Sequence, residues 1–202
     1  MPPVLFQSVL LRNLNEGHKA IKNADVMTAL SSYLSGYQKA PTLPPLKNAL
    51  HIITSSEKNS GPQGISTDEF EFRLKHIIQN LNLTTVSGDR QIVKTQKGVT
   101  EPLVARVFLL TGENEVPVSN VPVIFNYETG EGELEKEKTS GSDGTVQTTV
   151  HKIGSYKEAN HMIAVKLDYI SFLSKVNGDF AEKLLSPLKT KKATFNYAVQ
   201  TP

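Results

Sequence analysis

The sequence predicts an α+β protein, in which N-terminal α-helical hairpins of about four helices precede a C-terminal antiparallel β-sandwich. The hydrophobic period changes near Asn82, because apolar residues recur at helical spacing before it and at every second position after it. A stretch from Pro117 to Val150 then carries two alternating apolar runs, which glycine-containing turns separate. The apolar faces of such strands need a covering layer, and a second sheet supplies one. We therefore expect an α-helical domain at residues 1–82 and a β-sandwich domain at residues 83–202.

The composition excludes several classes of protein. The 202 residues are 38% hydrophobic and carry a net charge of +2, which fits one large or two small folded domains. Neither half has the excess of lysine and arginine that is typical of nucleic-acid binding. Cysteine is absent, which excludes disulfides, thiolate catalysis and cysteine-ligated metals. No apolar run reaches the roughly 18 residues of a membrane span, and residues 1–11 lack the basic region of a signal peptide.

Four helices are expected in the N-terminal part. Apolar residues at helical spacing place them at residues 4–22, 25–39, 45–56 and from Ser66 to about residue 81. In the first helix the predicted buried stripe consists of Val4, Leu5, Ser8, Leu11, Leu14 and Ile21. Asp25 can cap the second helix, and the Ser66–Glu69 pattern is a capping box that begins the fourth. A polar loop at residues 57–64 separates the last two helices.

The first two helices resemble a tetratricopeptide repeat unit. Small and aromatic residues and a closing proline fall at the offsets of that family, at Gly17, Ala20, Ala29, Tyr33 and Pro41. The chain departs from the family pattern in having no tryptophan, and Gly36 stands where alanine is commoner. An ordinary antiparallel helix pair remains the alternative. The resemblance implies a concave polar face for a partner's peptide, which we expect at Asn13, His18, Lys22, Ser31 and Gln38.

Seven strands are expected after residue 82. They lie at residues 83–86, 91–95, 102–110, 121–125, 145–150, 162–167 and 193–199, with one or two helical turns at 179–185. Period-two alternation puts Val121, Val123 and Phe125 on one face, which we expect to be buried. Gly144 follows Asp143 in a predicted turn and should have a positive φ. Seven strands is the number typical of an immunoglobulin-like sandwich.

The β region resembles bacterial immunoglobulin-like domains of the invasin and intimin type. The resemblance covers roughly residues 99–168. It is carried by Pro102-Leu103, Pro117, Val121-Pro122-Val123, Phe125, Gly130, Gly132, Thr139, Asp143-Gly144 and Val146. A helical hairpin followed by such a sandwich also resembles some bacterial envelope lipoproteins. These resemblances imply a location in the periplasm, the outer membrane or the cell surface, and a protein as partner.

The sequence contains no familiar catalytic motif. It has no Gly-x-Ser-x-Gly, phosphate-loop or His-Glu-x-x-His pattern. Its histidines are scattered, at His18, His51, His76, His151 and His161. His151 and His161 flank a loop and could approach one another, but the spacing of a metal site is missing. We expect no cofactor and no metal.

Two charged groups of residues have alternative interpretations. The acidic set is Glu128, Glu131, Glu133, Glu135 and Glu137. It could hold Ca²⁺, although a solvated edge strand fits its spacing better. The basic set is Lys189, Lys191 and Lys192, which could protect the edge of the last strand or pair with those glutamates. Residues 82–84 match a glycosylation sequon, which we interpret as chance.

The leading functional hypothesis is a non-enzymatic binding or structural module of a bacterial cell-envelope protein, acting through protein–protein interaction. One alternative is a carbohydrate- or ligand-binding accessory domain of a larger surface enzyme. Another is a small hydrolase whose site combines His151 or His161 with Asp168 or Asp143. Partner-binding residues and oligomeric state are not fixed by these patterns.

The predicted boundary between the two domains lies at residues 82–88, where the hydrophobic period changes. Limited proteolysis should therefore release a compact β fragment or cut within residues 57–64, because loops between folded units are the preferred sites of cleavage. Fragments would be identified by mass spectrometry. Cleavage spread evenly through residues 100–200 would contradict the two-domain prediction.

Overall fold

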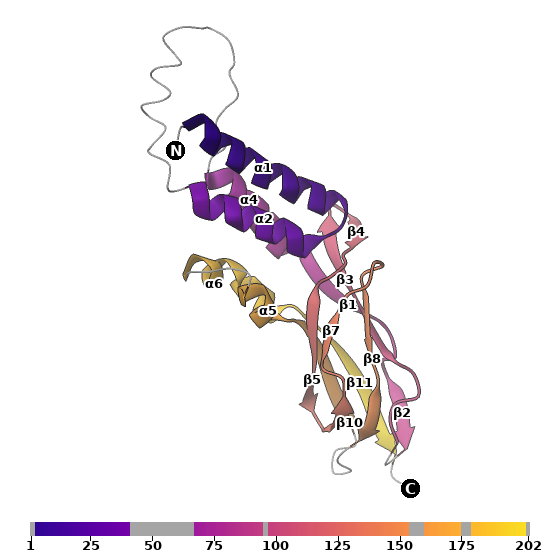
Figure 1. The fold of residues 1–202 in the computed structure, drawn as a ribbon. Helices are drawn as coiled ribbons and strands as arrows, with labels where there is room; N and C mark the ends of the chain where they lie inside the picture. The colour runs from indigo at the N-terminus through magenta and orange to yellow at the C-terminus, as the bar shows by residue number, and fades with distance from the viewer. Residues whose placement is uncertain (1–2, 41–66, 95–96, 154–159, 175–178, 201–202) are drawn as a thin grey trace.

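The computed structural model describes residues 3–40, 67–94, 97–153, 160–174 and 179–200 (Figure 1). Three α-helices form the N-terminal part: α1 (Pro3–Lys22), α2 (Val26–Lys39) and α4 (Thr67–Asn80). The predicted helix at 45–56 and the predicted loop at 57–64 lie outside the described residues. Helix α2 packs against both α1 and α4, so it forms the centre of this bundle.

The buried stripe of α1 differs in part from the predicted one. Leu14 and Ile21 pack against the core as predicted, Ser8 is exposed, and the side chains of Val4 and Leu5 lie outside the described residues. Leu10, Asn13, Gly17 and Ala20 are buried, whereas Leu11 is 50% exposed. Gly17 explains the difference, because a Cβ at this position would lie only 2.2 Å from Cε1 of the Tyr33 ring. The missing side chain lets the α1 backbone approach α2, and this rotates the predicted apolar face partly toward solvent.

The turn between α1 and α2 connects the helices to the β region. The Asp25 carboxylate accepts a hydrogen bond from the Thr28 backbone N–H at 3.0 Å, which confirms the predicted helix cap. Ala24, just before the cap, has a positive φ of 56°. Its carbonyl accepts a hydrogen bond from the Ser119 backbone N–H at 3.2 Å. The helix pair is therefore held to the loop that precedes strand β5 (Pro122–Thr129).

A second connection lies at the C-terminal end of α4. Strand β1 (Leu81–Ser87) follows α4 directly, without a linker. The Lys191 ammonium donates to the Gln79 carbonyl at 2.5 Å and to Oδ1 of Asn82 at 3.2 Å. A cation at this end of a helix also complements the partial negative charge of the last carbonyls. Burial lowers the pKa of Lys191, which reflects its position between α4 and the last strand.

The strands form two larger sheets and one small ribbon. The first sheet contains β1, β3 (Leu103–Thr111), β4 (Asn114–Pro117) and β8 (Thr145–Thr148). The second has the order β2 (Gln91–Lys94), β11 (Lys192–Gln200), β10 (Asn160–Leu167), β5 (Pro122–Thr129) and β7 (Glu137–Thr139). The ribbon pairs β6 (Gly132–Leu134) with β9 (Val150–Ile153). All seven predicted strand regions contain strands, and the structure adds β4, β6, β7 and β9.

The expectation of purely antiparallel sheets is wrong at one pair, because β2 runs parallel to β11. The physical reason lies at Gly88, which has a φ of +86° and whose missing Cβ would meet the Pro102 carbonyl at 2.1 Å. The chain leaves the first sheet there and joins the second. The predicted strand at 145–150 is also divided between two sheets, since β8 pairs with β3 and β9 pairs with β6.

Helices also lie between β10 and β11. These are α5 (Tyr169–Ser174), α6 (Asp179–Leu185) and the 3₁₀ helix η2 (Ser186–Thr190). Helix α6 was predicted from the sequence and α5 was not. Both α6 and η2 contact α4, and in Figure 1 α6 lies below α2, on the far side of α5 from the sheets. No helix in the described ranges is long and apolar enough to cross a membrane.

The inward faces of both larger sheets contribute to one hydrophobic cluster, which continues into the helices. Val121, Val123 and Phe125 are all buried in it, as the alternation predicted. The Phe125 ring stacks on Phe195 of β11 at a centroid distance of 6.3 Å. Gly144 has a φ of +76°, which confirms the predicted turn conformation.

Phe125→Ala should lower the free energy of unfolding by about 3–5 kcal/mol, because it removes a fully buried ring and leaves a cavity. Urea denaturation followed by circular dichroism would measure the loss. Phe72→Ala is the matched control, since Phe72 is 60% exposed on α4, and it should cost less than about 1 kcal/mol. Equal losses in the two variants would show that Phe125 is not a core residue.

Candidate functional site

Three titratable side chains meet inside the second sheet. The hydroxyls of Tyr127 and Tyr197 lie 2.8 Å apart, and the Tyr197 hydroxyl lies 3.3 Å from Nδ1 of His161. The His161 ring also stacks on Tyr197, with a centroid distance of 5.1 Å, and contacts the edge of Tyr127. We call this set the His161–Tyr197–Tyr127 relay.

The relay is assembled by strand register. Tyr127, His161 and Tyr197 come from the adjacent strands β5, β10 and β11, and His161 is directly opposite Tyr197. A β-bulge at Met162/Ile163 interrupts the pairing of β10 with β5. Such irregularities change the direction of side chains and are common beside functional sites. Ordinary alternation along β5 points Tyr127 inward with Phe125, while the next residue, Glu128, faces outward.

The glycine-containing turn at residues 130–132 covers the relay. A Cβ at Gly130 would lie 2.1 Å from Nδ1 of His161, and a Cβ at Gly132 would lie 2.4 Å from the Tyr127 hydroxyl. Gly130 has a φ of +78°, a conformation that other residues rarely adopt. The turn at residues 130–132 therefore packs its backbone directly on the relay.

Two of the three relay residues are closed to solvent, whereas Tyr127 is partly exposed. His161 and Tyr197 are each 1% exposed, and Nε2 of His161 has no hydrogen-bond partner among the described residues. Burial raises the pKa of both tyrosine hydroxyls, so each keeps its proton at neutral pH and can donate a hydrogen bond. His161 and Tyr197 are therefore out of reach of a substrate while the turn is in place.

The residues predicted for a hydrolase site have separate structural roles. Asp168 caps α5 by accepting from the Ser171 backbone N–H at 3.2 Å. Asp143 accepts from the backbone N–H and the hydroxyl of Thr145, at 3.0 and 2.7 Å, within its turn. His151 is exposed on β9. Within the described residues, no group of three or more histidine, aspartate and glutamate side chains could hold a metal ion.

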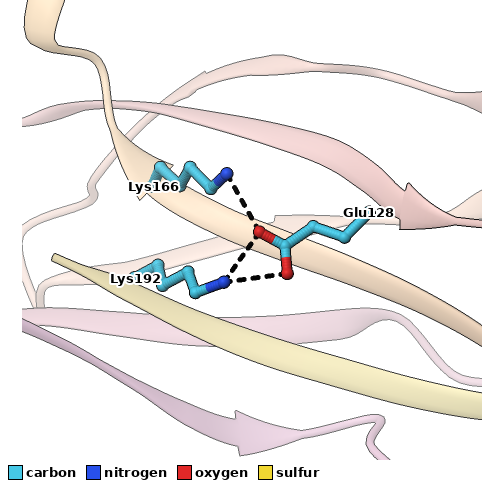
Figure 2. A network of polar contacts seen from close by, with 3 residues as sticks. All are labelled: Glu128, Lys166 and Lys192. Carbon is cyan, nitrogen blue, oxygen red and sulfur yellow. Dashed lines mark hydrogen bonds and ion pairs between the residues drawn. The ribbon is translucent and has the colours of Figure 1, made fainter. Parts of the chain in front are cut away.

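The acidic residues do not gather into a cation site within the described residues. Glu128 is held between two lysines of neighbouring strands (Figure 2), with Nζ of Lys166 at 3.0 Å and Nζ of Lys192 at 2.8 Å. The hydrogen bonds from Lys192 and then Lys166 lower the pKa of Glu128. Glu133 is 3.9 Å from Lys152, and Glu135 pairs with Lys138. The four glutamates after Glu128 are exposed, as expected for solvated strands.

The basic set serves three different purposes. Among the described contacts of these three lysines, the ion pair with a glutamate of the acidic set is that of Lys192 with Glu128. Lys189 pairs with Glu182 at 3.5 Å and lies over the Tyr169 ring at 4.4 Å. The expectation that these lysines protect an edge of the last strand is wrong for Lys189 and Lys191, because both precede β11, which begins at Lys192. Strand β2 pairs with β11 only from Tyr197 to Gln200.

The residues proposed for peptide binding divide into two groups. Asn13 is buried, which contradicts its expected exposure, and its Nδ2 has no partner among the described residues. His18 is half-buried against the Tyr33 ring at 5.9 Å. Burial and then the nearby Arg73 lower the pKa of His18, so its ring is neutral at pH 7. Lys22, Ser31 and Gln38 are exposed, as expected.

The other histidines have no site geometry. His76 is exposed on α4 and hydrogen-bonds Asn80, and His51 lies outside the described residues. Sequence reasoning singled out His161 but missed both relay tyrosines. Their inward position follows from the alternation that places Phe125 and Phe195 in the core, yet alternation alone does not say that their hydroxyls meet.

Comparison with known proteins gives partial structural similarity. No protein family matches the chain, and no curated protein matches it. Among solved structures, the D00-D0 domain of intimin is similar at 18% identity, over 58% of this chain and 46% of that chain, with a TM-score of 0.34. The D0-D1 domain of intimin is similar at 14% identity over the same shares, with a TM-score of 0.31. The match spans less than half the length of either intimin fragment.

Alkaline titration should reveal the buried hydroxyls. Burial raises the pKa of Tyr33 to about 12 and that of Tyr197 further, whereas a free tyrosine has a pKa near 10. The buried hydroxyl of each tyrosine therefore makes its full contribution to stability below about pH 10. That contribution is lost as the pH rises through the pKa that the tyrosine has in the folded protein. Absorbance at the tyrosinate band should show late ionisation, which Tyr33→Phe and Tyr197→Phe each reduce. Ionisation of every tyrosine near pH 10 in the folded protein would contradict the burial.

Proposed function

We propose that the chain is a non-enzymatic binding or structural module of a bacterial cell-envelope protein, which acts through protein–protein contact. One observation carries the proposal: His161 and Tyr197 of the relay are each 1% exposed, and the backbone of the turn at residues 130–132 packs on the relay. A catalytic site needs its reacting groups within reach of a substrate. Sealed hydrogen-bonded groups instead fix the register of three strands.

The architecture of the chain supports a scaffold role. We propose that residues 83–202 form an immunoglobulin-like β-sandwich and that residues 1–82 form a tetratricopeptide-like helical domain. The burial of alternate residues from both larger sheets in one cluster supports the sandwich. The close contact of Gly17 with Tyr33 and of Gly36 with Phe70 supports the helical packing. The envelope location rests on the intimin-type sequence pattern of residues 99–168.

Two of the sheet edges do not favour strand addition by a partner. Edge strands β4 and β7 have only four and three residues, and Glu115, Glu137 and Lys138 lie on them. Short charged edges oppose pairing with a foreign strand. The edge strand β1 is longer, with seven residues and no charged side chain. We therefore propose that a partner that meets the β4 or β7 edge is recognised through side chains rather than by extending a sheet.

The outer face of α4 is the most suitable surface for such recognition. Phe72 is 60% exposed there. The Arg73 guanidinium lies 5.6 Å from its ring centroid, and the His76 ring stacks on it at 6.3 Å. Glu69 holds the guanidinium through hydrogen-bonded contacts of 2.8 Å. An aromatic ring and an arginine, both already ordered, are frequent contributors to the energy of protein interfaces.

Partner capture tests this function. The tagged chain would be cross-linked in an envelope extract of the source organism, and its oligomeric state would be measured by light scattering. A specific protein should be captured by the wild type and by Ile92→Ala, a control at a side chain 68% exposed on β2. Phe72→Ala should reduce capture at least about ten-fold, the effect of losing one anchor residue.

Three outcomes would contradict the proposal. Equal capture by both variants would exclude the α4 face. Binding of a sugar with no protein partner would favour a carbohydrate-binding accessory domain. Turnover of a small substrate by the monomer would favour a hydrolase.

A further inference from the structure

We propose that α4 binds a second copy of this chain, with the two α4 helices packed face to face in antiparallel orientation about a two-fold axis at Phe72. The inference deepens the proposed function, on which it rests, by naming the partner that the outer face of α4 fits. It depends on an exposed aromatic ring and on the order of the charged residues along the helix.

The outer face of α4 lies opposite its buried face. Phe70, Leu74, Ile77 and Ile78 are buried, and Phe72 is two residues from both Phe70 and Leu74, which is about 200° around a helix. Helices α2, α6 and η2 all contact α4, yet Phe72 remains 60% exposed. These elements therefore leave the centre of the outer face open to a partner.

The aromatic ring at this centre is held in place. The Arg73 guanidinium lies 5.6 Å from the centroid of the Phe72 ring, and the His76 ring stacks on it with an interplanar angle of 20°. A ring that is ordered before binding loses less side-chain entropy in a contact. A two-fold axis at Phe72 brings the two rings together, and aromatic pairs gain more than their buried area alone provides.

The charge of α4 changes sign at Phe72. Its charged side chains are acidic before this residue and basic after it, namely Asp68, Glu69 and Glu71 and then Arg73 and Lys75. Two such helices in antiparallel orientation place the acidic half of each against the basic half of the other. Parallel packing would place like charges together, which is unfavourable. The order of the charges therefore selects an antiparallel second copy as the occupant of this face.

Both flanks of the outer face carry an acid and a base four residues apart. A carboxylate oxygen of Glu69 lies 2.8 Å from a guanidinium nitrogen of Arg73, and one of Glu71 lies 2.6 Å from Nζ of Lys75. An antiparallel two-fold brings the same flank of the two helices together with its direction reversed, so each carboxylate faces a basic residue of the other copy. Exposed pairs within one helix contribute little, so these side chains can pair across the contact at small cost.

The size of the face indicates a weak association. Helix α4 has 14 residues and is therefore about 21 Å long. A contact along one such face buries well under the roughly 800 Å² per partner of a standard interface. We expect a dissociation constant on the order of 0.1–1 mM, a concentration that molecules tethered close to one another reach locally.

Sedimentation equilibrium of the pure, intact chain tests the self-association at about 0.02–2 mM protein. The average mass should rise toward that of a dimer, and Phe72→Ala should raise the dissociation constant at least about ten-fold. Ile92→Ala is the matched control, because Ile92 is a similarly exposed apolar residue of β2, and it should leave the constant unchanged. Circular dichroism would verify that each variant is folded. A monomer at every concentration, or a dimer equally stable in Phe72→Ala, would overturn the proposal.

Charge reversal tests the pairing of the flanks. Glu71→Lys makes one flank wholly basic, and Lys75→Glu makes the same flank wholly acidic, so each variant alone should dimerise at least about ten-fold more weakly than the wild type. An equimolar mixture should regain the dimer, now with one chain of each kind, because a basic flank then faces an acidic one. Wild-type dimerisation of either variant, or a mixture no stronger than its components, would overturn the pairing.

Cross-linking tests the orientation, and it is clean because the chain has no cysteine of its own. Asp68 and His76 are exposed and lie four residues to either side of Phe72, so antiparallel packing places Asp68 of one copy opposite His76 of the other. Like positions are then about 12 Å apart along the helix axes. A short bis-maleimide should cross-link a mixture of Asp68→Cys and His76→Cys several-fold faster than either variant alone. Faster cross-linking within one variant would overturn the antiparallel arrangement.

These measurements use pure protein, which separates the inference from the proposed function. Capture from the envelope extract that depends on Phe72, by a chain that is monomeric when pure, would overturn the self-association and leave the proposed function standing. Dimer formation with no other protein captured would support the inference and would remove a foreign partner from the proposed function.

Discussion

Close packing of aromatic rings on glycine backbone is the constraint on which the described fold depends most. It recurs in the helical bundle and in the β region. In four places a Cβ on the glycine would lie within 2.4 Å of a ring or its hydroxyl, and the pairs are Gly17 with Tyr33, Gly36 with Phe70, Gly130 with His161 and Gly132 with Tyr127. Each ring packs directly on the backbone of the glycine. Such contacts fix the distance between elements because neither the ring nor the backbone can yield.

Local patterns were sufficient to predict most of the fold. The burial of Phe125 and the positive φ of Gly144 follow from period-two alternation and turn chemistry, which act over a few residues. The buried face of α1 was predicted incorrectly in part because the prediction follows apolar side chains. Gly17 contributes to the interface between α1 and α2 by having no side chain. The parallel pairing of β2 with β11 was missed because it depends on a change of sheet at Gly88, and sequence spacing does not reveal which sheet a strand joins.

The candidate site was harder to predict than the fold. His161 was recognised as a possible functional residue, but it was grouped with His151 because the two are near in sequence. In the structure its partners are Tyr127 and Tyr197, which are far from it along the chain and adjacent to it across the sheet. Strand register creates this proximity, and register is set by the whole sheet. The two tyrosines were also difficult to distinguish from ordinary core residues, because aromatic side chains are common on inward faces.

The parallel pairing of β2 and β11 has a mechanical consequence. In this pair Gln91 lies opposite Tyr197 and Lys94 opposite Gln200, so the start of β2 and the end of β11 lie at opposite ends of the shared ladder. Tension applied between the helical bundle and the C-terminal end of β11 would slide these strands along each other. All the hydrogen bonds of the ladder would then bear the load together instead of breaking one after another, so the pair would act as a force clamp within a tethered chain.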